Sequence, residues 1–470
     1  MEFDAVLLAP RRARMIEEGL WHDRTINNDL DACLAACADK LALTAYRVEA
    51  GDVRRFTYRE LAQMADRVAL GLSRLGVKPN DVVACQLPNW WQFTVTYLAC
   101  SRIGAVINPL MHIFRERELN FMLKHGEAKV IIAPKVFRGF DYEQMITAIQ
   151  PNLPDLKHIV VVDGQGANSF EALLSGPAWE SEPDAATILG AHRPGPDDIT
   201  QLIYTSGTTG EPKGVMHSAN TVMANIIPYA QRLQLDAEDV VLMASPMAHQ
   251  TGFMYGLMMP IMLKASAVLQ DIWEPKKAVE VINGEKASFT MASTPFLTDL
   301  TKAVVDNMTP VPTLKTFFCA GAPIPGPLVE QARAALGTKI VSAWGMSENG
   351  AVTLIELNDP DERAFTTDGK PLAGVDLKVV DIDGNTAPAG EAGKLYVRSC
   401  SNFGGYLKRP QWNNTDAEGW FDTGDLARMD AQGYIRITGR SKDVIIRGGE
   451  NIPVVEIESL LYRHPAIAMV

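Results

Sequence analysis

Apolar residues recur every three to four positions over residues 61–75, the spacing of one face of a helix. Thr57 and Glu60 precede this run as a capping box, and Gly76 follows it. The sequence therefore predicts an amphipathic helix whose start and end are both defined.

Short apolar runs then alternate with helical segments. Residues 81–85 and 105–108 indicate strands, with a helix over residues 91–103 between them. The same rhythm returns in five further runs, at residues 129–133, 159–163, 240–245, 267–270 and 289–292. Strands separated by helices favour a parallel sheet with crossover helices. We expect an α/β protein with a large doubly wound region over most of the chain.

The pattern changes after about residue 357, where short runs at 375–381, 393–398 and 433–438 are separated by turn sequences. They predict a small antiparallel, β-barrel-like unit at about residues 358–440. Pro453, with Glu456 and Glu458 close behind it, predicts a helix start. We expect a large N-terminal domain over residues 1–442, then a hinge and the start of a small α+β C-terminal domain over residues 443–470, truncated at Val470.

Composition narrows the class of protein. The 470 residues are 47% hydrophobic and 21% charged, as in a folded α/β protein longer than one core supports. The net charge of −12, without a long Lys/Arg run, excludes nucleic acid as an expected partner. Charged residues, Gly and Pro interrupt the most apolar stretch, residues 226–269, so we expect no membrane-spanning helix. Six scattered cysteines fit reduced thiols in the cytoplasm.

One segment joins an apolar strand to a loop suited to phosphate. The chain runs Thr205-Ser-Gly-Thr-Thr-Gly-Glu-Pro-Lys213 after the apolar residues 202–204. The glycines allow close approach of the main chain, and the hydroxyls and Lys213 offer donors and positive charge to an anion. It is not a Walker A loop, because Gly214 follows the lysine. Taken alone, such a cluster is more often a surface loop.

The segment is similar to the phosphate-binding signature of the adenylate-forming superfamily, which includes acyl-CoA synthetases, luciferases and peptide synthetase adenylation domains. Three further motifs follow in the superfamily's order: Ala343-Trp-Gly-Met-Ser-Glu348, Trp420-Phe-Asp-Thr-Gly-Asp425, and Gly439-Arg-Ser-Lys-Asp443 with Gly448-Gly449. Four specific motifs in this order over roughly 250 residues are not expected by chance. The resemblance implies ATP, Mg²⁺ and coenzyme A as reactants or cofactors.

The resemblance also implies a nucleotide site. Glu348 would hold Mg²⁺ together with Thr205, and Trp344 would stack on adenine. Asp425, near Arg440, would accept hydrogen bonds from the ribose hydroxyls. The residues of this site are Thr205, Ser206, Gly207, Thr208, Thr209, Lys213, Gly321, Ala322, Pro323, Ala343, Trp344, Gly345, Met346, Ser347, Asp425 and Arg440. Lys213, Glu348, His249 and Arg440 would form the catalytic group. Without the resemblance, a lone Glu is more often solvated and a lone Trp or His more often part of the core.

An apolar wall is expected around the acid. The residues placed there by resemblance are His249, Phe253, Met254, Gly256, Ala320 and Met346. Each buried CH₂ contributes about 0.8 kcal/mol, so such a wall selects acids by apolar volume. His249 stands where amino-acid-activating domains carry Asp, so the substrate is not expected to be an amino acid. Lys442, Asp443, Gly448 and Gly449 would form the hinge and the CoA channel.

We expect an ATP-dependent acid-CoA ligase that forms an acyl-AMP and then an acyl-CoA. Residues 19–21 and 86–90 are most similar to short- and medium-chain fatty acyl-CoA synthetases and cyclohexanecarboxylate-CoA ligases, which favours a medium-chain fatty or alicyclic acid. An aryl (benzoate-type) CoA ligase and an enzyme that delivers the acyl group to a carrier protein stay as alternatives. A third is a scaffold without catalysis, against which the intact Lys213, Glu348, Asp425 and Arg440 argue. The sequence leaves the oligomeric state open, with a homodimer as one option.

Complete members of the superfamily carry a C-terminal domain on the order of 100 residues, which holds a late catalytic lysine. That lysine is not among the 470 residues. We expect adenylation by these residues alone to be slower than by an extended form, as pyrophosphate exchange would show.

Overall fold

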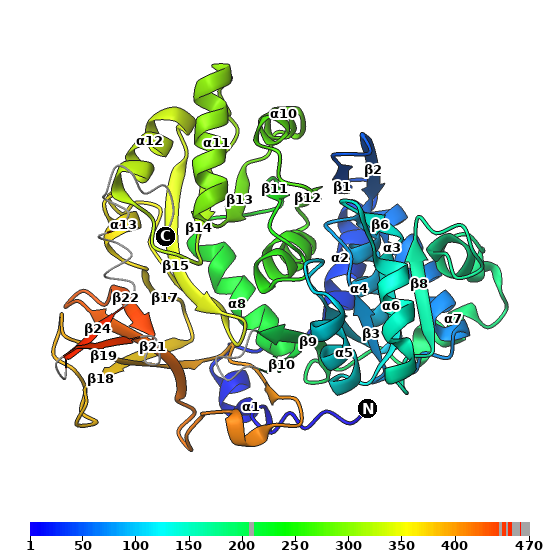
Figure 1. The fold of residues 1–470 in the computed structure, drawn as a ribbon, viewed down its shortest axis with the longest axis horizontal. Coiled ribbons are helices and arrows are strands. Elements are labelled where there is room, and N and C mark those ends of the chain that lie inside the picture. The colour runs from blue at the N-terminus through cyan, green and yellow to red at the C-terminus, as the bar shows by residue number, and fades with distance from the viewer. Residues whose placement is uncertain (206–210, 441–443, 448–449, 454–460, 462–470) are drawn as a thin grey trace.

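Two large sheets organise the chain, and a smaller antiparallel sheet adjoins them (Figure 1). The computed structural model describes residues 1–205, 211–440, 444–447, 450–453 and 461. The alternation of strands and helices predicted an α/β fold, which is confirmed. The alternation did not assign each strand to one of the two large sheets.

The first sheet has seven strands in the order β20-β10-β9-β4-β3-β5-β8. These strands are β3 (Val82–Cys85), β4 (Val106–Pro109), β5 (Ala128–Pro134), β8 (His158–Val162), β9 (Ile199–Thr205), β10 (Lys213–Ser218) and β20 (Gly405–Tyr406). The five strands from β9 to β8 are parallel, whereas β10 runs antiparallel to both β9 and β20. A strand from far along the chain therefore completes the edge that carries Lys213.

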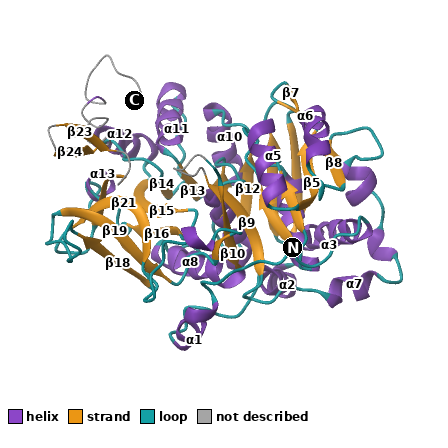
Figure 2. Cartoon of the chain, turned by 60° about the horizontal axis from the view of Figure 1, so that its bottom comes forward, coloured by secondary structure: helices purple, strands orange, loops and turns teal. Residues whose placement is uncertain are grey.

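The second sheet has nine strands in the order β17-β16-β15-β14-β13-β11-β12-β1-β2. They are β1 (Leu41–Arg47), β2 (Asp52–Thr57), β11 (Val240–Met243), β12 (Ser266–Gln270), β13 (Phe289–Ala292), β14 (Thr316–Cys319), β15 (Lys339–Met346), β16 (Gly350–Leu354) and β17 (Lys370–Pro371). In Figure 2, α10 (Pro275–Glu285) and α11 (Thr294–Asn307) lie on one side of these strands and α8 (Ala219–Arg232) on the other. Helices on both faces explain why the central strands are buried, whereas the edge strand β2 is mostly exposed.

The third sheet contains β18 (Val375–Val380), β19 (Ala392–Ser399), β21 (Phe421–Met429) and β22 (Ile435–Arg440). Its strands follow one another in antiparallel order, and β18 and β22 stand at its two edges. The predicted barrel-like closure is wrong for the described residues, because these edges do not pair. A second apolar cluster, which includes Trp344 and Tyr406, packs beside this sheet.

Beyond β22, strands β23 (Val444–Arg447) and β24 (Glu450–Pro453) form a hairpin. The prediction of a helix beginning near Pro453 is wrong at residues 452–453, which belong to β24. Residues 454–460 lie outside the described part of the chain.

Local signals in the sequence explain the ends of several helices. In α3 (Tyr58–Arg74) the Thr57 side chain accepts a hydrogen bond from the Glu60 amide, and the Glu60 carboxylate accepts one from the Thr57 amide at 2.8 Å. This is the predicted capping box. The helix α4 (Trp91–Ile103) has the predicted bounds and stops at Gly104, whose φ is +70°. Residues 92–103 of α4 are all buried, so this helix has no solvent face.

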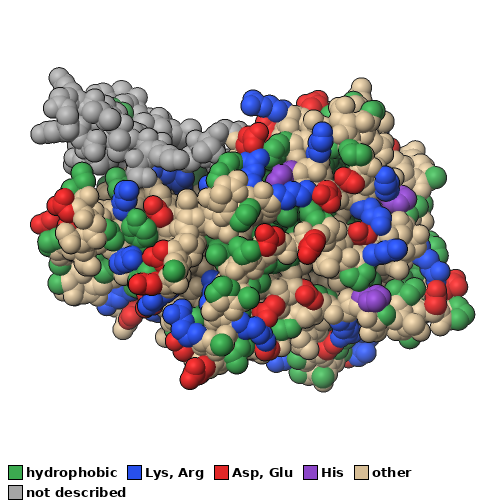
Figure 3. Space-filling model, turned by 90° about the horizontal axis from the view of Figure 1, so that it is seen from below, with side chains coloured by type: hydrophobic (Ala, Val, Ile, Leu, Met, Phe, Trp, Pro, Cys, Tyr) green, Lys and Arg blue, Asp and Glu red, His purple; other side chains and the backbone are tan. Residues whose placement is uncertain are grey.

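The remaining helices cover the two large sheets or connect their strands. They are α1 (Ala9–Glu17), α2 (Ile26–Cys37), α5 (Glu116–His125), α6 (Tyr142–Ile149), α7 (Ala185–Ala191), α9 (Met259–Leu263), α12 (Gly326–Leu336) and α13 (Arg363–Thr366). Within the described residues, none of the helices is both long and apolar enough to span a bilayer. On the face in Figure 3, acidic and basic side chains are interspersed.

Candidate functional site

The ends of β9 and β10 bring Thr205 and Lys213 together. The two residues are paired across these antiparallel strands, so the Lys213 side chain starts where β9 stops. Ser206, Gly207, Thr208 and Thr209, which connect the strands, lie outside the described residues. The structure thus places one hydroxyl and one cation of the predicted phosphate site at a common sheet end.

Glu348 lies in the turn between β15 and β16 and is only 5% exposed. The Tyr406 hydroxyl donates a hydrogen bond of 2.6 Å to its Oε1. Burial raises the pKa of Glu348, whereas this hydrogen bond and the positive charges of Lys213 and Arg440 act in the opposite direction. The predicted solvent-exposed alternative for Glu348 is therefore wrong.

Tyr406 connects this carboxylate to Lys213. Strand β20 pairs with β10 at Val215 and Tyr406, which brings the phenol beside the lysine strand. The Lys213 ammonium lies 4.8 Å from the centroid of the Tyr406 ring and 5.6 Å from that of Trp412, both within cation–π range. Lys213 and Glu348, 135 positions apart in the sequence, therefore share one neighbour.

Asp425 forms a second group with Trp344 and Arg440. Its Oδ2 accepts a hydrogen bond of 2.9 Å from the Trp344 indole, and its Oδ1 lies 3.2 Å from Nε of Arg440. Asp425 and Arg440 are cross-strand partners in β21 and β22. Burial raises the pKa of Asp425, and the Arg440 charge and the indole hydrogen bond oppose that rise. Trp344 is 7% exposed and packs in the second apolar cluster, so its described contacts are those of a core residue and a donor to Asp425.

The remaining predicted nucleotide residues follow two neighbouring strands. Gly321, Ala322 and Pro323 lie in the loop after β14 and are exposed, and Gly321 has a φ of +97°, which favours glycine. Residues 343–347 continue β15 into its turn, where Ala343 and Trp344 are buried, Gly345 is exposed, and Met346 and Ser347 are half-buried. Because β14 and β15 are parallel, both segments lie at the same edge of the sheet.

The predicted acid-binding residues divide into two sets. His249 is exposed, and its Nδ1 lies 3.2 Å from the Thr251 hydroxyl. Ala320 and Met346 are half-buried near the nucleotide edge. Phe253, Met254 and Gly256 are instead buried in the π-helix Gly252–Met258.

Packing explains the burial of the second set. The Phe253 ring contacts the Tyr97 ring of α4 at a centroid distance of 4.7 Å. A Cβ at Gly256 would lie 2.4 Å from Cγ of Met243. The described contacts of these residues are therefore with the core.

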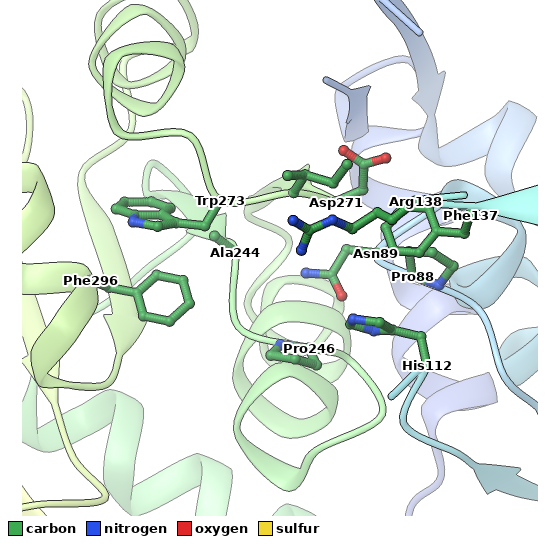
Figure 4. Close-up of a pocket in the computed structure, with 11 residues that line it drawn as sticks. Pro88, Asn89, His112, Phe137, Arg138, Ala244, Pro246, Asp271, Trp273 and Phe296 are labelled. Carbon is green, nitrogen blue, oxygen red and sulfur yellow. The ribbon is translucent and has the colours of Figure 1, made fainter. Parts of the chain in front are cut away.

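A cavity of about 130 Å³ lies between the two large sheets. In Figure 4 the Arg138 guanidinium points into it between Asp271 and Asn89, with His112 below and Trp273 and Phe296 on the opposite wall. Burial and the positive charges of Arg115 and Arg138 lower the pKa of His112. The sequence did not predict this cavity, although Pro88, Ala244 and Asp271 each follow a strand end, where ligands commonly bind in α/β sheets.

His217 was also missed. It is buried on β10, and its Nε2 lies 2.8 Å from the backbone oxygen of Ser347, the residue before Glu348. A carbonyl only accepts, so Nε2 donates, and Nδ1 accepts from the Thr221 hydroxyl at 3.0 Å. Burial lowers the pKa of His217 to about 4, which keeps the ring neutral. Its place four residues after Lys213 on one strand, and hence on the same face, was a usable signal.

Four predicted hinge and CoA residues, Lys442, Asp443, Gly448 and Gly449, lie outside the described part of the chain. Within the described part, no group of three or more His, Cys, Asp and Glu side chains is placed to hold a metal ion. The six cysteines are free thiols, and five of them are buried.

Comparison with known proteins agrees with the motifs. The profile of the family described as AMP-binding enzyme matches residues 30–407. The chain belongs to this family. The predicted membership of the adenylate-forming, AMP-binding enzymes is thus confirmed, and with it the prediction that the protein is a ligase.

Several AMP-binding enzymes match nearly the whole chain. A medium-chain fatty-acid–CoA ligase of Escherichia coli is 36% identical over 459 residues, covering 97% of this chain and 79% of the relative. A salicylyl-CoA synthase / salicylate adenylyltransferase of a Streptomyces species is 30% identical over 463 residues, covering 97% and 82%. A 2,3-dihydroxybenzoate-AMP ligase of Bacillus subtilis is 29% identical over 455 residues, covering 96% and 81%.

Solved structures of AMP-binding enzymes share the fold. The anthranilate CoA ligase AuaEII in complex with anthranoyl-AMP has a TM-score of 0.84 at 26% identity, covering 95% of this chain and 83% of that one. ATP-bound MatB from Rhodopseudomonas palustris has a TM-score of 0.79 at 26% identity, covering 95% and 84%. The fold and the family therefore rest on independent comparisons.

Proposed function

We propose that this protein is an ATP-dependent acid-CoA ligase that acts through an acyl-adenylate. The observation that carries the proposal is the convergence of Lys213, Glu348 and Tyr406 where β10, β20 and the β15–β16 turn meet. A cation and a buried carboxylate at one sheet end suit a nucleoside triphosphate, because the cation can bind the phosphates and the carboxylate their metal counter-ion. The ATP-bound and acyl-AMP-bound neighbours support this use of the fold.

In the first half-reaction, an oxygen of the acid forms a bond to the α-phosphorus of ATP. The bond from that phosphorus to the bridging oxygen breaks, and pyrophosphate leaves with the electron pair. Lys213 offsets the negative charge of the phosphates beside Thr205. The loop residues that we propose to bind the same phosphates are Ser206, Gly207, Thr208 and Thr209. The Asp425 carboxylate accepts hydrogen bonds from the ribose hydroxyls. Trp344 and Arg440 hold this carboxylate in place. Gly321, Ala322, Pro323 and residues 343–347 form the adenine edge.

Magnesium fits the residues near Lys213. Mg²⁺ is commonly bound through one or two carboxylates together with substrate phosphates, so a single buried Glu348 with the Thr205 hydroxyl is a suitable donor set. The bound ion would neutralise phosphate charge during transfer. Tyr406 fixes the orientation of the Glu348 carboxylate through its 2.6 Å hydrogen bond.

We propose a medium-chain fatty or alicyclic acid as the substrate. The relative at 36% identity is named for medium-chain fatty acids, whereas those named for salicylate and dihydroxybenzoate are 30% and 29% identical. His249, in place of an acidic side chain, gives no partner for a substrate amine. We assign His249, Phe253, Met254, Gly256, Ala320 and Met346 to the acid site, with the three buried residues shaping its wall from behind.

In the second half-reaction, the CoA sulfur forms a bond to the acyl carbon as its thiol proton and AMP leave. We propose Lys442 and Asp443 as the hinge between domains 1–442 and 443–470, and Gly448 and Gly449 as part of the CoA channel. Free cysteines fit a reducing cytoplasm.

The experiment is to incubate the protein with ATP, Mg²⁺ and CoA and a panel of octanoate, cyclohexanecarboxylate and benzoate, and to analyse the products by mass spectrometry. We expect octanoyl-CoA or the cyclohexane analogue, and no product from Glu348→Gln. Acyl-AMP that never passes to CoA would favour a carrier-protein acceptor. Absence of both acyl-AMP and acyl-CoA with every acid would contradict the proposal.

A further inference from the structure

A second cation lies beside the lysine strand. Arg409, three residues after Tyr406, places its guanidinium 4.1 Å from the centroid of the Trp412 ring. Its side chain is 16% exposed, and its Nη2 donates to Glu211. Its Nη1 is buried and has no hydrogen-bond partner in the part of the chain that the structure describes. This guanidinium is therefore ordered but not fully engaged.

Trp412 is shared between two cations. The Lys213 ammonium lies 5.6 Å from the same ring centroid, so Arg409 and Lys213 converge on one indole. Two cations that share one aromatic ring make this neighbourhood positively charged, which favours the binding of an anion. Glu211, two residues before Lys213, is the acidic partner of Arg409. The Glu211 side chain is 60% exposed, so its carboxylate can leave Arg409 for water while the guanidinium stays in place.

Guanidinium chemistry indicates which anion would replace Glu211. Arginine presents a planar fork that matches two oxygens of a phosphate, and an aromatic ring beneath it fixes the plane of that fork. We propose that Arg409 is a second cation for the polyphosphate of the bound nucleotide, held by Trp412 and exchanging Glu211 for phosphate oxygens. This inference rests on the proposed adenylation, in which the same oxygens become pyrophosphate.

The test compares three variants, Arg409→Met, Lys408→Met and Glu211→Gln, by calorimetric titration with ATP, pyrophosphate and AMP. Arg409→Met should weaken ATP and pyrophosphate binding by about tenfold to a hundredfold, the loss expected for hydrogen bonds to charged groups, and leave AMP binding within about twofold. Lys408→Met is the matched control. Lys408→Met removes one positive charge from the neighbouring position. The Lys408 ammonium binds Glu127 and the His125 carbonyl oxygen, so we expect no loss of ATP affinity from this variant.

The outcomes distinguish an Arg409 that binds phosphate from an Arg409 that only stabilises the local structure. Glu211→Gln removes the competing carboxylate and should leave ATP affinity unchanged or higher. Equal losses of ATP and AMP affinity in Arg409→Met, or ATP affinity in Glu211→Gln that falls as far as in Arg409→Met, would overturn the inference. If the wild-type protein binds ATP but Arg409→Met binds it equally well, only this inference fails; if the wild-type protein binds no nucleotide, the proposed function fails as well.

Discussion

The hydrogen bond from Tyr406 acts on the pKa of Glu348, and its effect can be measured. Its hydrogen bond to Oε1 stabilises the ionised carboxylate and so opposes the rise in pKa that burial causes. Tyr406→Phe removes this hydrogen bond, and the pKa of Glu348 should rise further. Because the ionised form is the one that binds a metal, the acid limb of the pH profile of kcat/KM should move to higher pH.

Tyr229→Phe provides the control for this change. Tyr229 is also fully buried, but its hydroxyl contacts the Met291 sulfur at 3.4 Å and no carboxylate. We expect its pH profile to match that of the wild-type protein. The Tyr406 variant should also lose about 1.5–3 kcal/mol of stability, as for a hydrogen bond to a charged group. An acid limb that stays in place in Tyr406→Phe would contradict the proposed role.

At the scale of single elements, α3 shows a start that local sequence defines. The Thr57 side chain accepts from the Glu60 amide, one of the donors that a helix leaves without an internal partner. Thr57→Ala should lower the free energy of unfolding by about 1 kcal/mol, measured by urea denaturation. Thr57→Ser keeps the acceptor and should retain wild-type stability. Both variants should keep wild-type kinetic constants, and a change in KM for ATP would show that α3 couples to the site.

At the scale of the whole molecule, Arg102 connects layers that belong to different sheets. It is 3% exposed on α4, and its guanidinium binds Asp66 of α3 at 2.8 Å and Asp31 of α2 at 3.1 Å. Helix α2 also packs against α9, which lies between strands β11 and β12 of the second sheet. Arg102 thus stabilises the junction of the two sheets.

Arg102→Met should destabilise the protein by about 3 kcal/mol, because it removes a buried guanidinium and leaves the partly buried Asp66 carboxylate without its cation, whereas Asp31 keeps Arg193. Thermal unfolding measures this loss. Arg59→Met is the control, since Arg59 pairs with an Asp39 that is 83% exposed, and its unfolding midpoint should not move. Equal midpoints for the two variants would contradict the structural role of Arg102.

The sequence by itself determined many of the elements and the family. Helix α4 and strand β13 have the predicted bounds, because their apolar runs end at local signals such as Gly104. The four motifs indicated the family, which the comparison confirmed. These features are encoded over a few residues, where periodicity, capping and residue type act directly.

Only the tertiary structure decided which strands pair and which side chains meet. The pairing of β20 with β10, about 190 residues apart, brings Tyr406 to Glu348 and Trp412 to Lys213. The burial of Trp344 against Asp425 likewise depends on the third sheet. Apolar residues at every second position indicate that a strand has a buried face, but they do not indicate which strand pairs with its edge. Partners far apart in the sequence therefore follow from packing alone.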